Sequence, residues 1–525
     1  MQCKKSDFLV IGSGIAGLYY ALTVADHGKV IIVTKNNPDE SSTRRAQGGI
    51  AAVLDKKDSF ESHISDTLKT GAGLGKVDIV EMTIKEGPNH IKQLMQLGLK
   101  FTRDDNGSLH LGREGGHSHR RVASIGDFVG KELENVLLHN ILHHPNVSVL
   151  DYHLAIDLIV ANKTCGGAYV LNLKTNEIIT CAAKNVFLAA GGAGQVYRNT
   201  SNPNIATGDG IAMAYRAGVP IANMEFFQFH PTGFHYHKDH DFLVSEVLRG
   251  EGGVLRLEDG TDFMAQVHSK GSLAPRDIIS QTIDDELKRT GKNCVYLDMT
   301  HFDESFLRNK FPRAYEKCSL YGINMKTEWI PVVPVAHYCC GGIVVDKNGQ
   351  TSIKNLSAAG ENAYTGFHGA CRLASNSLLE ALVFASRAAL YDINTKPVHN
   401  IEIPSWNNTN TCNSAYLSVK LDEIRRLMWN YVGIVRSDKS LEYANRRITL
   451  INEEIINDYS KSLVTKELIE LYNIAIVAHI IIKSAICRKE SCGTHKNIDY
   501  PNIEEKFRKD ISIVKEEKDK SIFLL

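Results

Sequence analysis

Residues Asp7–Gly17 read DFLVIGSGIAG, and this stretch decides the fold of the N-terminal part of the chain. The apolar run Asp7–Ile11 is typical of a short buried strand, and Gly14–His27 has the apolar spacing of a helix. Between them, Gly12-Ser13-Gly14-Ile15-Ala16-Gly17 matches G-x-G-x-x-G. In this motif the first glycine allows a tight turn, the second admits a pyrophosphate, and the third lets helix and strand pack closely. The stretch therefore predicts a dinucleotide site at a helix N-terminus.

The second strand of this unit, Val30–Thr34, completes a βαβ arrangement, but the acidic residue expected at its end is missing. Lys35 stands there instead. A lysine at this point could pair with the 2′-phosphate of NADP, or it could contact the adenosine part of FAD. The pattern of this one unit leaves both cofactors open.

Three further segments of small residues extend the nucleotide site. Ser42–Ala51 reads STRRAQGGIA, and small side chains let such a loop lie against a flavin ring. Two more apolar strands run into glycine, at Leu188–Gly192 and Ser357–Glu361. Together with Asp7–Gly17 they make a four-part set of strand ends and small-residue loops. The loop residues expected to contact the cofactor are Ser42, Thr43, Arg44, Arg45, Ala46, Gln47, Gly48 and Gly49.

Bulk composition argues against several classes of function. The 525 residues include 60 Lys+Arg and 60 Asp+Glu, so the formal net charge is zero. This balance gives no support to a nucleic-acid partner or an anionic membrane surface. The longest apolar run near the C-terminus, Ile474–Ile482, is far shorter than the roughly 20 residues of a membrane span. The 11 cysteines, with no C-x-x-C pair, suit a reducing cytoplasm better than a disulfide framework.

The four-part set resembles the glutathione-reductase-like FAD fold, and specifically the succinate dehydrogenase/fumarate reductase flavoprotein family. The resemblance runs from Asp7 to about Pro501. Six further blocks carry it: REGGHSHRR (113–121), FHPTG (229–233), RGEGG (249–253), LAPRD (273–277), AHY (336–338) and GACRLASNSL (369–378). It implies an α/β FAD-binding Rossmann domain, an inserted α+β capping domain and a C-terminal helical bundle. The expected bounds are 1–232 and 334–405 for the FAD-binding domain, 233–333 for the capping (substrate lid) domain, and 412–525 for the helical domain.

The resemblance implies a small dicarboxylate as the substrate. The two charged ends of such a molecule need cationic or hydrogen-bonding partners when they are buried. His230, His337 and Arg372 are donors of this kind, and each lies in a turn punctuated by glycine or proline. By resemblance, Ser245 and Glu246 line the same pocket, with a serine hydroxyl where the family commonly has threonine.

Arg276 matches the catalytic arginine of the family. Because arginine is effectively always protonated, we expect it to stabilise charge and position the substrate first, with proton delivery when fumarate is reduced. By resemblance, Ser377 and Leu378 begin a helix whose N-terminus faces the flavin, where its partial positive charge would stabilise the reduced, anionic form. Asp209 and Glu361 match family contacts to the ribityl or adenosine part of FAD.

Two positions separate the branches of the family. Succinate dehydrogenases and quinol-linked fumarate reductases carry a histidine, bonded covalently to FAD, where this chain has Ser42. We therefore expect FAD to be held non-covalently. Glu114 resembles a glutamate that pairs with the amine of an amino-acid substrate. The alternative is a surface carboxylate paired with Arg113 or Arg120. Both positions favour L-aspartate as the substrate.

The resemblance then implies the reaction, in which a hydride passes from Cα of L-aspartate to FAD and iminosuccinate forms. O₂ or fumarate would reoxidise the flavin. Iminosuccinate is the substrate of quinolinate synthase, so the expected pathway is de novo NAD synthesis. The alternative within the family is a soluble fumarate reductase or succinate dehydrogenase flavoprotein. A flavoprotein that binds or modifies RNA is disfavoured by the neutral charge balance.

Three segments outside these motifs carry separate expectations. Cys487–Gly493 (CRKESCG) matches the C-terminal family motif R-x-E-S-R-G except that Cys492 replaces its second arginine, and we disfavour a Cys487–Cys492 bond. The loop His235–His240 holds three histidines without the spacing of a metal site, so no metal is expected. Glu504–Lys520 is densely charged and is expected to be a solvated helix or a frayed tail.

Overall fold

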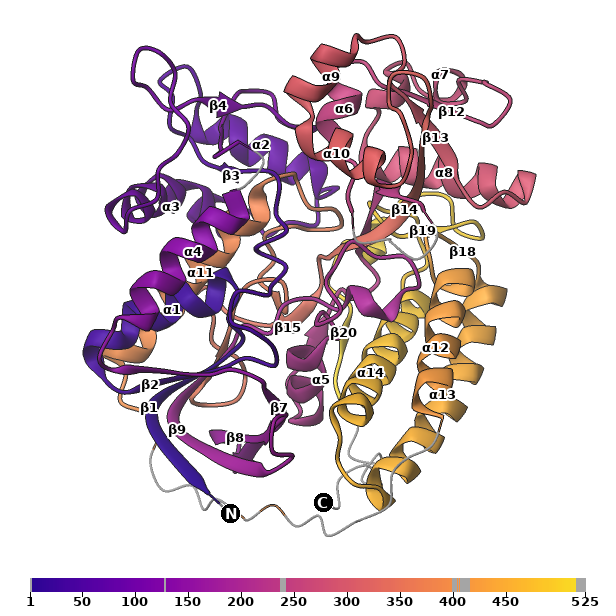
Figure 1. Cartoon of the computed structure of the whole chain (residues 1–525). Helices are drawn as coiled ribbons and strands as arrows, with labels where there is room; N and C mark the ends of the chain where they lie inside the picture. The colour runs from indigo at the N-terminus through magenta and orange to yellow at the C-terminus, as the bar shows by residue number, and fades with distance from the viewer. Residues whose placement is uncertain are drawn as a thin grey trace.

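The computed structural model describes residues 2–126, 129–236, 242–398, 404, 406 and 416–515. Its N-terminal part is built on a seven-stranded sheet (Figure 1). The strands are β1 (Cys3–Ile11), β2 (Val30–Val33), β6 (Val147–Leu150), β7 (His153–Ala161), β8 (Thr164–Asn172), β9 (Ile178–Leu188) and β16 (Leu356–Ala358). Strands β6, β2, β1 and β9 are parallel neighbours in that order. The far edge of β9 is shared by antiparallel β8 and parallel β16, and β7 pairs with β8.

The carboxyl ends of the central parallel strands lie level with one another. Ile11 of β1 is in register with Leu188 of β9, which is also in register with Ala358 of β16. Gly12 follows β1 with a φ of +114°, and a Cβ there would lie 2.1 Å from the carbonyl oxygen of Ala189. A Cβ on Gly17 would lie 2.0 Å from the carbonyl oxygen of Gly12. The first and third glycines of the motif are therefore fixed by sterics.

Three helices cover one face of this sheet, namely α1 (Ile15–Val24), α4 (Val129–Leu142) and α11 (Asn376–Asn394) (Figure 1). Helices α2 (Phe60–Thr70) and α3 (Val77–Gln96) pack beside them. Helix α1 begins after Gly14, which has no side chain to cap it. The hydroxyl of Thr43 accepts a hydrogen bond from the Ile15 backbone N–H at 3.1 Å, which ties the loop 42–49 to the N-terminus of α1.

The inserted segment forms a second layer above the sheet (Figure 1). Its antiparallel sheet consists of β11 (Phe227–Phe234), β14 (Ile330–Cys339), β13 (Val295–Asp298) and β12 (Val254–Arg256). Its helices are α6 (Glu246–Gly250), α7 (Met264–Val267), α8 (Arg276–Thr290), α9 (Glu304–Lys310) and α10 (Pro312–Leu320). The segment has its own apolar core, from Phe234 to Val332. The expected bounds 233 and 333 fall inside β11 and β14, so both strands are shared with the FAD-binding part.

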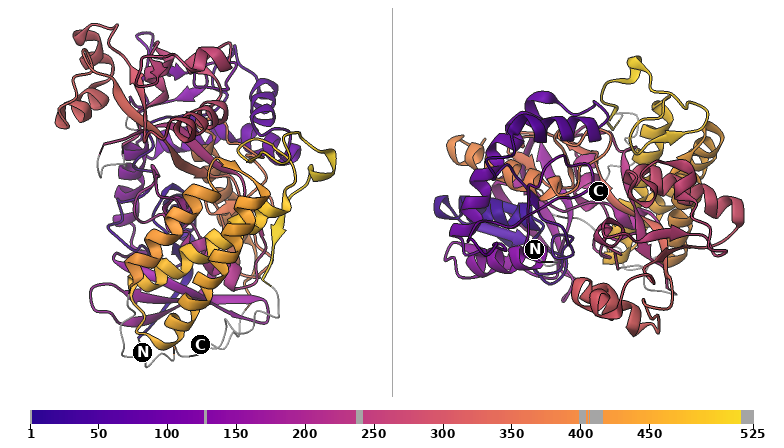
Figure 2. Two further views of the ribbon diagram at one scale, coloured as in Figure 1. Left: turned by 90° about the vertical axis from the view of Figure 1, so that its right-hand side faces the viewer. Right: turned by 90° about the horizontal axis from the view of Figure 1, so that it is seen from above.

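Three C-terminal helices lie side by side, namely α12 (Leu417–Tyr431), α13 (Asp438–Lys461) and α14 (Lys466–Cys487) (Figure 2). Helix α14 is apolar on nearly all sides and packs against α12, α13 and α5 (Asp209–Arg216). In the described part of the chain it is the one helix long and apolar enough to cross a membrane, yet 78% of that stretch is buried. Its buried side chains belong to the same core as the large sheet. Helix α14 is therefore a core helix that joins the bundle to the FAD-binding part.

The expectation of a helix or frayed tail over 504–520 is wrong for the described residues up to 515. A 3-10 turn covers Glu505–Phe507, and β20 (Ser512–Ile513) pairs with β10 (Ile221–Ala222). The side chain of Asn223 accepts from the Ile511 backbone N–H at 2.9 Å. This partner lies almost 300 residues away in sequence, so local charge patterning cannot reveal it. Cys487 and Cys492 carry free thiols in this structure.

The remaining short elements complete the fold. They are β3 (Ile50–Ala51), β4 (Leu111–Gly112), β5 (Val122–Ala123), β15 (Gly342–Val344), β17 (Ala363–Tyr364), β18 (Val435–Arg436), β19 (Lys496–Asn497), and the 3-10 turns η1 (Ala25–His27), η2 (Gly194–Val196) and η3 (Gly271–Leu273). Strands β3, β5 and β4 form a small sheet in which the loop 113–121 connects β4 to β5, and β18 pairs with β19.

Candidate active site

A large cavity lies between the ends of the parallel strands and the inserted segment, with a volume of about 2390 Å³. Every residue that the sequence predicts for the cofactor or the substrate lines this cavity, except Gly17. Gly17 instead packs against Gly12, as the motif requires of its third glycine. A typical small-molecule pocket measures roughly 300–1,000 Å³, so this cavity has room for an extended dinucleotide together with a small substrate.

Several glycines that line the cavity are fixed by sterics, because a Cβ there would collide with neighbouring protein atoms. A Cβ on Gly49 would lie 2.3 Å from the carbonyl oxygen of Ala123, and one on Gly192 would lie 2.2 Å from Glu361 Oε1. The N-termini of α1 and α11 both open onto the cavity. Two helix N-termini offer partial positive charge to the phosphates and to an anionic ring system.

Lys35 is held by carboxylates at one end of the cavity. Its Nζ donates to Asp209 Oδ2 and to Glu470 Oε1, both at 2.8 Å, and to Thr207 Oγ1 at 2.6 Å. Burial acts to raise the pKa of Asp209, but Lys35 outweighs this effect and the pKa is lowered. A 2′-phosphate beside these two carboxylates would be repelled. The geometry therefore favours FAD over NADP, which the sequence left open.

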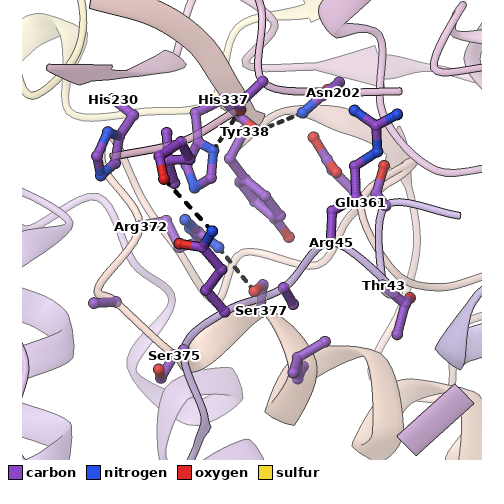
Figure 3. A pocket seen from close by; sticks show the side chains of 18 of the residues that line it. Thr43, Arg45, Asn202, His230, His337, Tyr338, Glu361, Arg372, Ser375 and Ser377 are labelled. Carbon is purple, nitrogen blue, oxygen red and sulfur yellow. Dashed lines mark hydrogen bonds between the residues drawn. The ribbon is translucent and has the colours of Figure 1, made fainter. Parts of the chain in front are cut away.

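The two arginines of the loop 42–49 point in different directions. Arg44 Nη2 lies 3.3 Å from Asp39, and its Nη1 lies 3.7 Å from the buried carboxylate of Glu134 on α4. Figure 3 shows Arg45 in the pocket near Glu361. Burial raises the pKa of Glu361 to about 7, although the Cys339 backbone N–H donates to it. Both arginines line the cavity, but Arg44 is paired with carboxylates while Arg45 extends toward Glu361.

Two histidines face each other on the substrate side of the cavity. The ring centroids of His230 and His337 are 5.4 Å apart. Figure 3 shows both rings and Arg372 on one side of the pocket, with Thr43, Arg45 and Glu361 on the other. Burial holds the pKa of each histidine well below its ordinary value, and nearby arginines push it lower still. Both rings are therefore neutral at neutral pH.

Hydrogen bonds assign the tautomer of His230. The Thr232 backbone N–H donates to His230 Nδ1 at 3.3 Å, and a backbone N–H can only donate. The neutral ring therefore carries its hydrogen on Nε2 and offers a donor. His337 Nδ1 is bonded to Ser201 Oγ at 2.8 Å, and Asn202 holds the His337 carbonyl at 2.9 Å. Both contacts fix the orientation of the His337 ring.

A row of alternating charge in the inserted segment consists of Arg276, Glu246 and Arg249. Arg276 Nε donates to Glu246 Oε2 at 2.6 Å, and Arg249 Nη2 lies 4.0 Å from the same oxygen. Burial acts to raise the pKa of Glu246, but the two arginines lower it to about 2. Arg249 is 1% exposed, and its Nε and Nη2 have no hydrogen-bond partner in the described structure. Ser245 caps the helix that carries Glu246, accepting from the Val247 N–H at 3.4 Å.

Glu114 faces the cavity rather than the surface. Ser375 Oγ donates to Glu114 Oε2 at 2.6 Å and accepts from the Gly49 backbone N–H at 3.1 Å. Burial raises the pKa of Glu114, while Ser375 and Arg276 act to lower it. Within the described residues no ion pair joins Glu114 to Arg113 or Arg120, and Arg113 Nε donates to a backbone carbonyl. The alternative of a surface ion pair is therefore wrong.

Sequence reasoning missed several residues that complete the site. Arg249 and Tyr338 lie within sequence blocks that carry the family resemblance, so the sequence did indicate them. Gln228 lies one residue before a block, and its Oε1 accepts from Arg372 Nε and Nη2 at 3.3 and 3.2 Å. Ser375 also lies within such a block, although its partner Glu114 is 261 residues away. Glu470 gave no local signal, because its partner Lys35 is 435 residues away in sequence. Among the residues that the structure describes, no group of three metal-ligating side chains occurs. His237 and His240 of the histidine loop lie outside the described residues.

Comparisons with known proteins agree with this geometry. The family model for an FAD binding domain matches residues 7–378, and that for a fumarate reductase flavoprotein C-terminus matches 421–522. The chain is 45% identical to an L-aspartate oxidase of Pseudomonas aeruginosa over 96% of this chain and 97% of that protein. It is 41% identical to a chloroplastic L-aspartate oxidase of Arabidopsis thaliana, over 96% of this chain and 83% of that one.

The likeness extends to solved structures. The FrdA chain of E. coli quinol fumarate reductase, solved as a point mutant, has a TM-score of 0.90 at 31% identity, covering 99% of this chain and 96% of that one. These matches confirm the expected fold class and FAD as the cofactor. The chain belongs to the succinate dehydrogenase/fumarate reductase flavoprotein family and, within it, to the L-aspartate oxidases.

Proposed function

We propose that the chain oxidises L-aspartate to iminosuccinate with non-covalently bound FAD. The observation that carries the proposal is the place of Glu114, whose carboxylate faces the same cavity as Arg276, Arg372 and the two histidines. The cavity thus offers one anion for an amine and several donors for two carboxylates. Relatives that are 41–46% identical over most of the chain, and that bear the name L-aspartate oxidase, support the proposal.

FAD, when bound, supplies the two-electron acceptor for the hydride that leaves Cα of aspartate. In this proposal the neutral Nε2–H of His230, together with His337 and Arg372, holds the substrate carboxylates. Arg372 contributes full charge, whereas each histidine contributes a directed donor. Arg276 adds a second full charge, fixed in place by Glu246 at 2.6 Å.

The amine needs separate handling. An ammonium has no lone pair to form the C=N bond, so it must lose one proton before or as the hydride leaves. Glu114 pairs with this ammonium, accepts the proton that it loses, and so selects an amino acid over succinate. When fumarate is reduced instead, a proton must reach carbon, and Arg276 is the donor that Glu246 and Arg249 can resupply. Ser245 offers a hydroxyl beside this row.

The roles proposed for the cofactor-side residues follow from their positions. The backbone of 12–17 and the loop 42–49 would cradle the dinucleotide, and Asp209 and Glu361 would contact its ribityl or adenosine part. Ser377 and Leu378 open α11 toward the ring system, where the helix N-terminus favours negative charge. Either O₂ or fumarate reoxidises the flavin. The product feeds quinolinate synthase and de novo NAD synthesis, and the free cysteines of the described residues fit a cytoplasmic location.

Anaerobic titration of the yellow protein tests the activity. L-Aspartate is expected to bleach the flavin absorbance within seconds to minutes, while D-aspartate leaves it unchanged and succinate bleaches it far more slowly. Equal bleaching by succinate and L-aspartate would favour the alternative, a soluble succinate dehydrogenase or fumarate reductase. No bleaching by any of the three would remove the proposal.

Acid precipitation tests how the cofactor is held. The side chain of Ser42 cannot form the covalent bond to FAD that a histidine forms at this position in the dehydrogenases. All FAD is therefore expected in the supernatant after trichloroacetic acid treatment. The measurement is flavin absorbance in supernatant and washed pellet. A succinate dehydrogenase flavoprotein run in parallel controls for incomplete extraction. Flavin that stays in the pellet of this protein would contradict the prediction.

A further inference from the structure

Arg372 is a buried cation of the substrate cavity whose hydrogen-bond partners are neutral. Its Nη1 donates to Ser377 Oγ at 2.8 Å, and its Nε and Nη2 share Gln228 Oε1. In the part of the chain that the structure describes, no carboxylate lies within 4.0 Å of this guanidinium. A substrate carboxylate therefore has no resident anion to displace. Burial lowers the pKa of Arg372, and Tyr338 and Glu361 act to raise it, so the compensation of this buried cation comes from groups beyond ion-pair distance.

The ring of Tyr338 covers one side of this guanidinium. The Arg372 Cζ lies 4.3 Å from the ring centroid, which is cation–π distance. In Figure 3 the Tyr338 ring lies among His337, Arg372 and Ser377. The ring supplies negative electrostatic potential without offering an acceptor that competes for the hydrogen bonds of the guanidinium.

A buried carboxylate lies at the hydroxyl end of this ring. Tyr338 Oη is 3.2 Å from Glu380 Oε2 and 3.1 Å from His368 Nε2, and that nitrogen is 2.9 Å from the same carboxylate oxygen. Thr365 Oγ1 donates to the other oxygen, Oε1, at 2.5 Å. Glu380 is 1% exposed and is not among the residues that line the cavity. Among its hydrogen-bond partners in the described structure, Tyr338 is the one that lines the cavity.

The hydrogen bonds indicate that Glu380 is an anion and His368 is neutral. His368 Nδ1 is buried and has no partner, so an imidazolium would bury an unpaired N–H. A neutral ring with its hydrogen on Nε2 donates to Glu380, and the buried Nδ1 then carries only a lone pair and no unpaired N–H. Glu380 then accepts from Tyr338, His368 and Thr365, which are neutral donors. A phenol that donates to a carboxylate has a more electron-rich ring and binds a cation more strongly.

We propose that Glu380 is a positioning residue for the substrate carboxylate and acts as a remote counter-ion of Arg372 through the ring of Tyr338. The arrangement keeps Arg372 compensated while its donors stay available to the substrate. Helix α11 sets both ends of the arrangement, because Ser377 in its first turn binds the guanidinium and Glu380 lies three residues later. This inference deepens the proposed dicarboxylate site and rests on it.

Two variants of the holoenzyme test the inference. Glu380→Gln removes the charge at nearly constant volume, and Tyr338→Phe keeps the ring but breaks the link to Glu380. Each is expected to raise the Kd of succinate, read from the flavin spectrum, and the KM of L-aspartate by about 5- to 20-fold, the range of a weakened cation–π contact in a desolvated site. We expect kcat to stay within about twofold of the parent value, because the lost interaction stabilises the ground state and the transition state equally. FAD content should match the parent.

Asp392 offers a matched control on the same helix. It is buried, and its carboxylate accepts from Tyr20 Oη at 2.6 Å, from Ser357 and from Gln350, which reproduces the local chemistry of Glu380. Asp392→Asn is expected to lower the melting temperature without changing the Kd of succinate. The double variant of Glu380→Gln and Tyr338→Phe should have a Kd for succinate no higher than that of the single variant that binds succinate more weakly. Both substitutions interrupt the same series of contacts, so their effects should not add.

The outcomes separate cleanly. If the parent binds no succinate, the proposed dicarboxylate site itself fails. If the parent binds it and Tyr338→Phe and Glu380→Gln bind it within twofold of the parent, only this inference is overturned, and Glu380 is a structural carboxylate like Asp392. If Glu380→Gln does not fold, Tyr338→Phe alone decides. Additive losses in the double variant would also overturn the inference, because they would show two independent effects.

Discussion

Replacing Arg276 by lysine is expected to lower kcat/KM for L-aspartate on the order of 100-fold or more, with FAD content unchanged. Arg276 lies at the cavity, where its Nε is bonded to Glu246 and its remaining N–H groups are left for the substrate. Lysine keeps the charge but loses the planar fork that can hold Glu246 and a substrate carboxylate together. The loss corresponds to about 3 kcal/mol of transition-state stabilisation.

The control for this variant separates catalysis from the stability of the inserted segment. Arg256 forms a similar pair with Asp298 at 2.7 Å in the same segment but does not line the cavity. Arg256→Lys should lower the melting temperature by an amount comparable with Arg276→Lys and leave kcat/KM nearly unchanged. Should Arg276→Leu oxidise aspartate almost as well as the parent, Arg276 is not catalytic, and His230 and His337 become the next residues to substitute.

Replacing Glu114 by glutamine is expected to weaken aspartate oxidation roughly 10- to 100-fold, because one charge-assisted pair in a partly desolvated site is worth about 1.5–3 kcal/mol. Fumarate has no amine, so its reduction should change much less in the same variant. The ratio of the two activities is therefore the measurement. Glu316→Gln, which removes one negative charge elsewhere on the cavity wall, controls for a general change in potential.

The pH profile of the parent gives a second reading on Glu114. Burial raises the pKa of this carboxyl, and a protonated Glu114 cannot pair with an ammonium. As the pH falls through that raised pKa, aspartate oxidation should decline. In Glu114→Gln this acidic limb should be missing. Equal losses of aspartate oxidation and fumarate reduction, with the acidic limb retained, would show that Glu114 is structural.

The sequence by itself determined the features that depend on neighbouring residues. Gly12 must follow the first strand, because its φ of +114° and its approach to Ala189 exclude any side chain. The apolar periodicity of Gly14–His27 predicted a helix, and in the structure this helix begins at Ile15. The sequence blocks also placed His230 and Arg372 among the candidate residues, and the fold brings both to one cavity. Backbone sterics and local patterning act over a few residues, so a single sequence reveals them.

The tertiary structure decided everything that depends on partners distant in the chain. Lys35 could have met a phosphate, but Asp209 and Glu470, 174 and 435 residues away, occupy its ammonium. Glu114 could have been a surface carboxylate, but Ser375 turns it into the cavity. The tail near Ile511 could have been a helix, but the backbone near Asn223 binds it as a strand. In each case the competing local states differ little in free energy, and burial against a distant partner selects one of them.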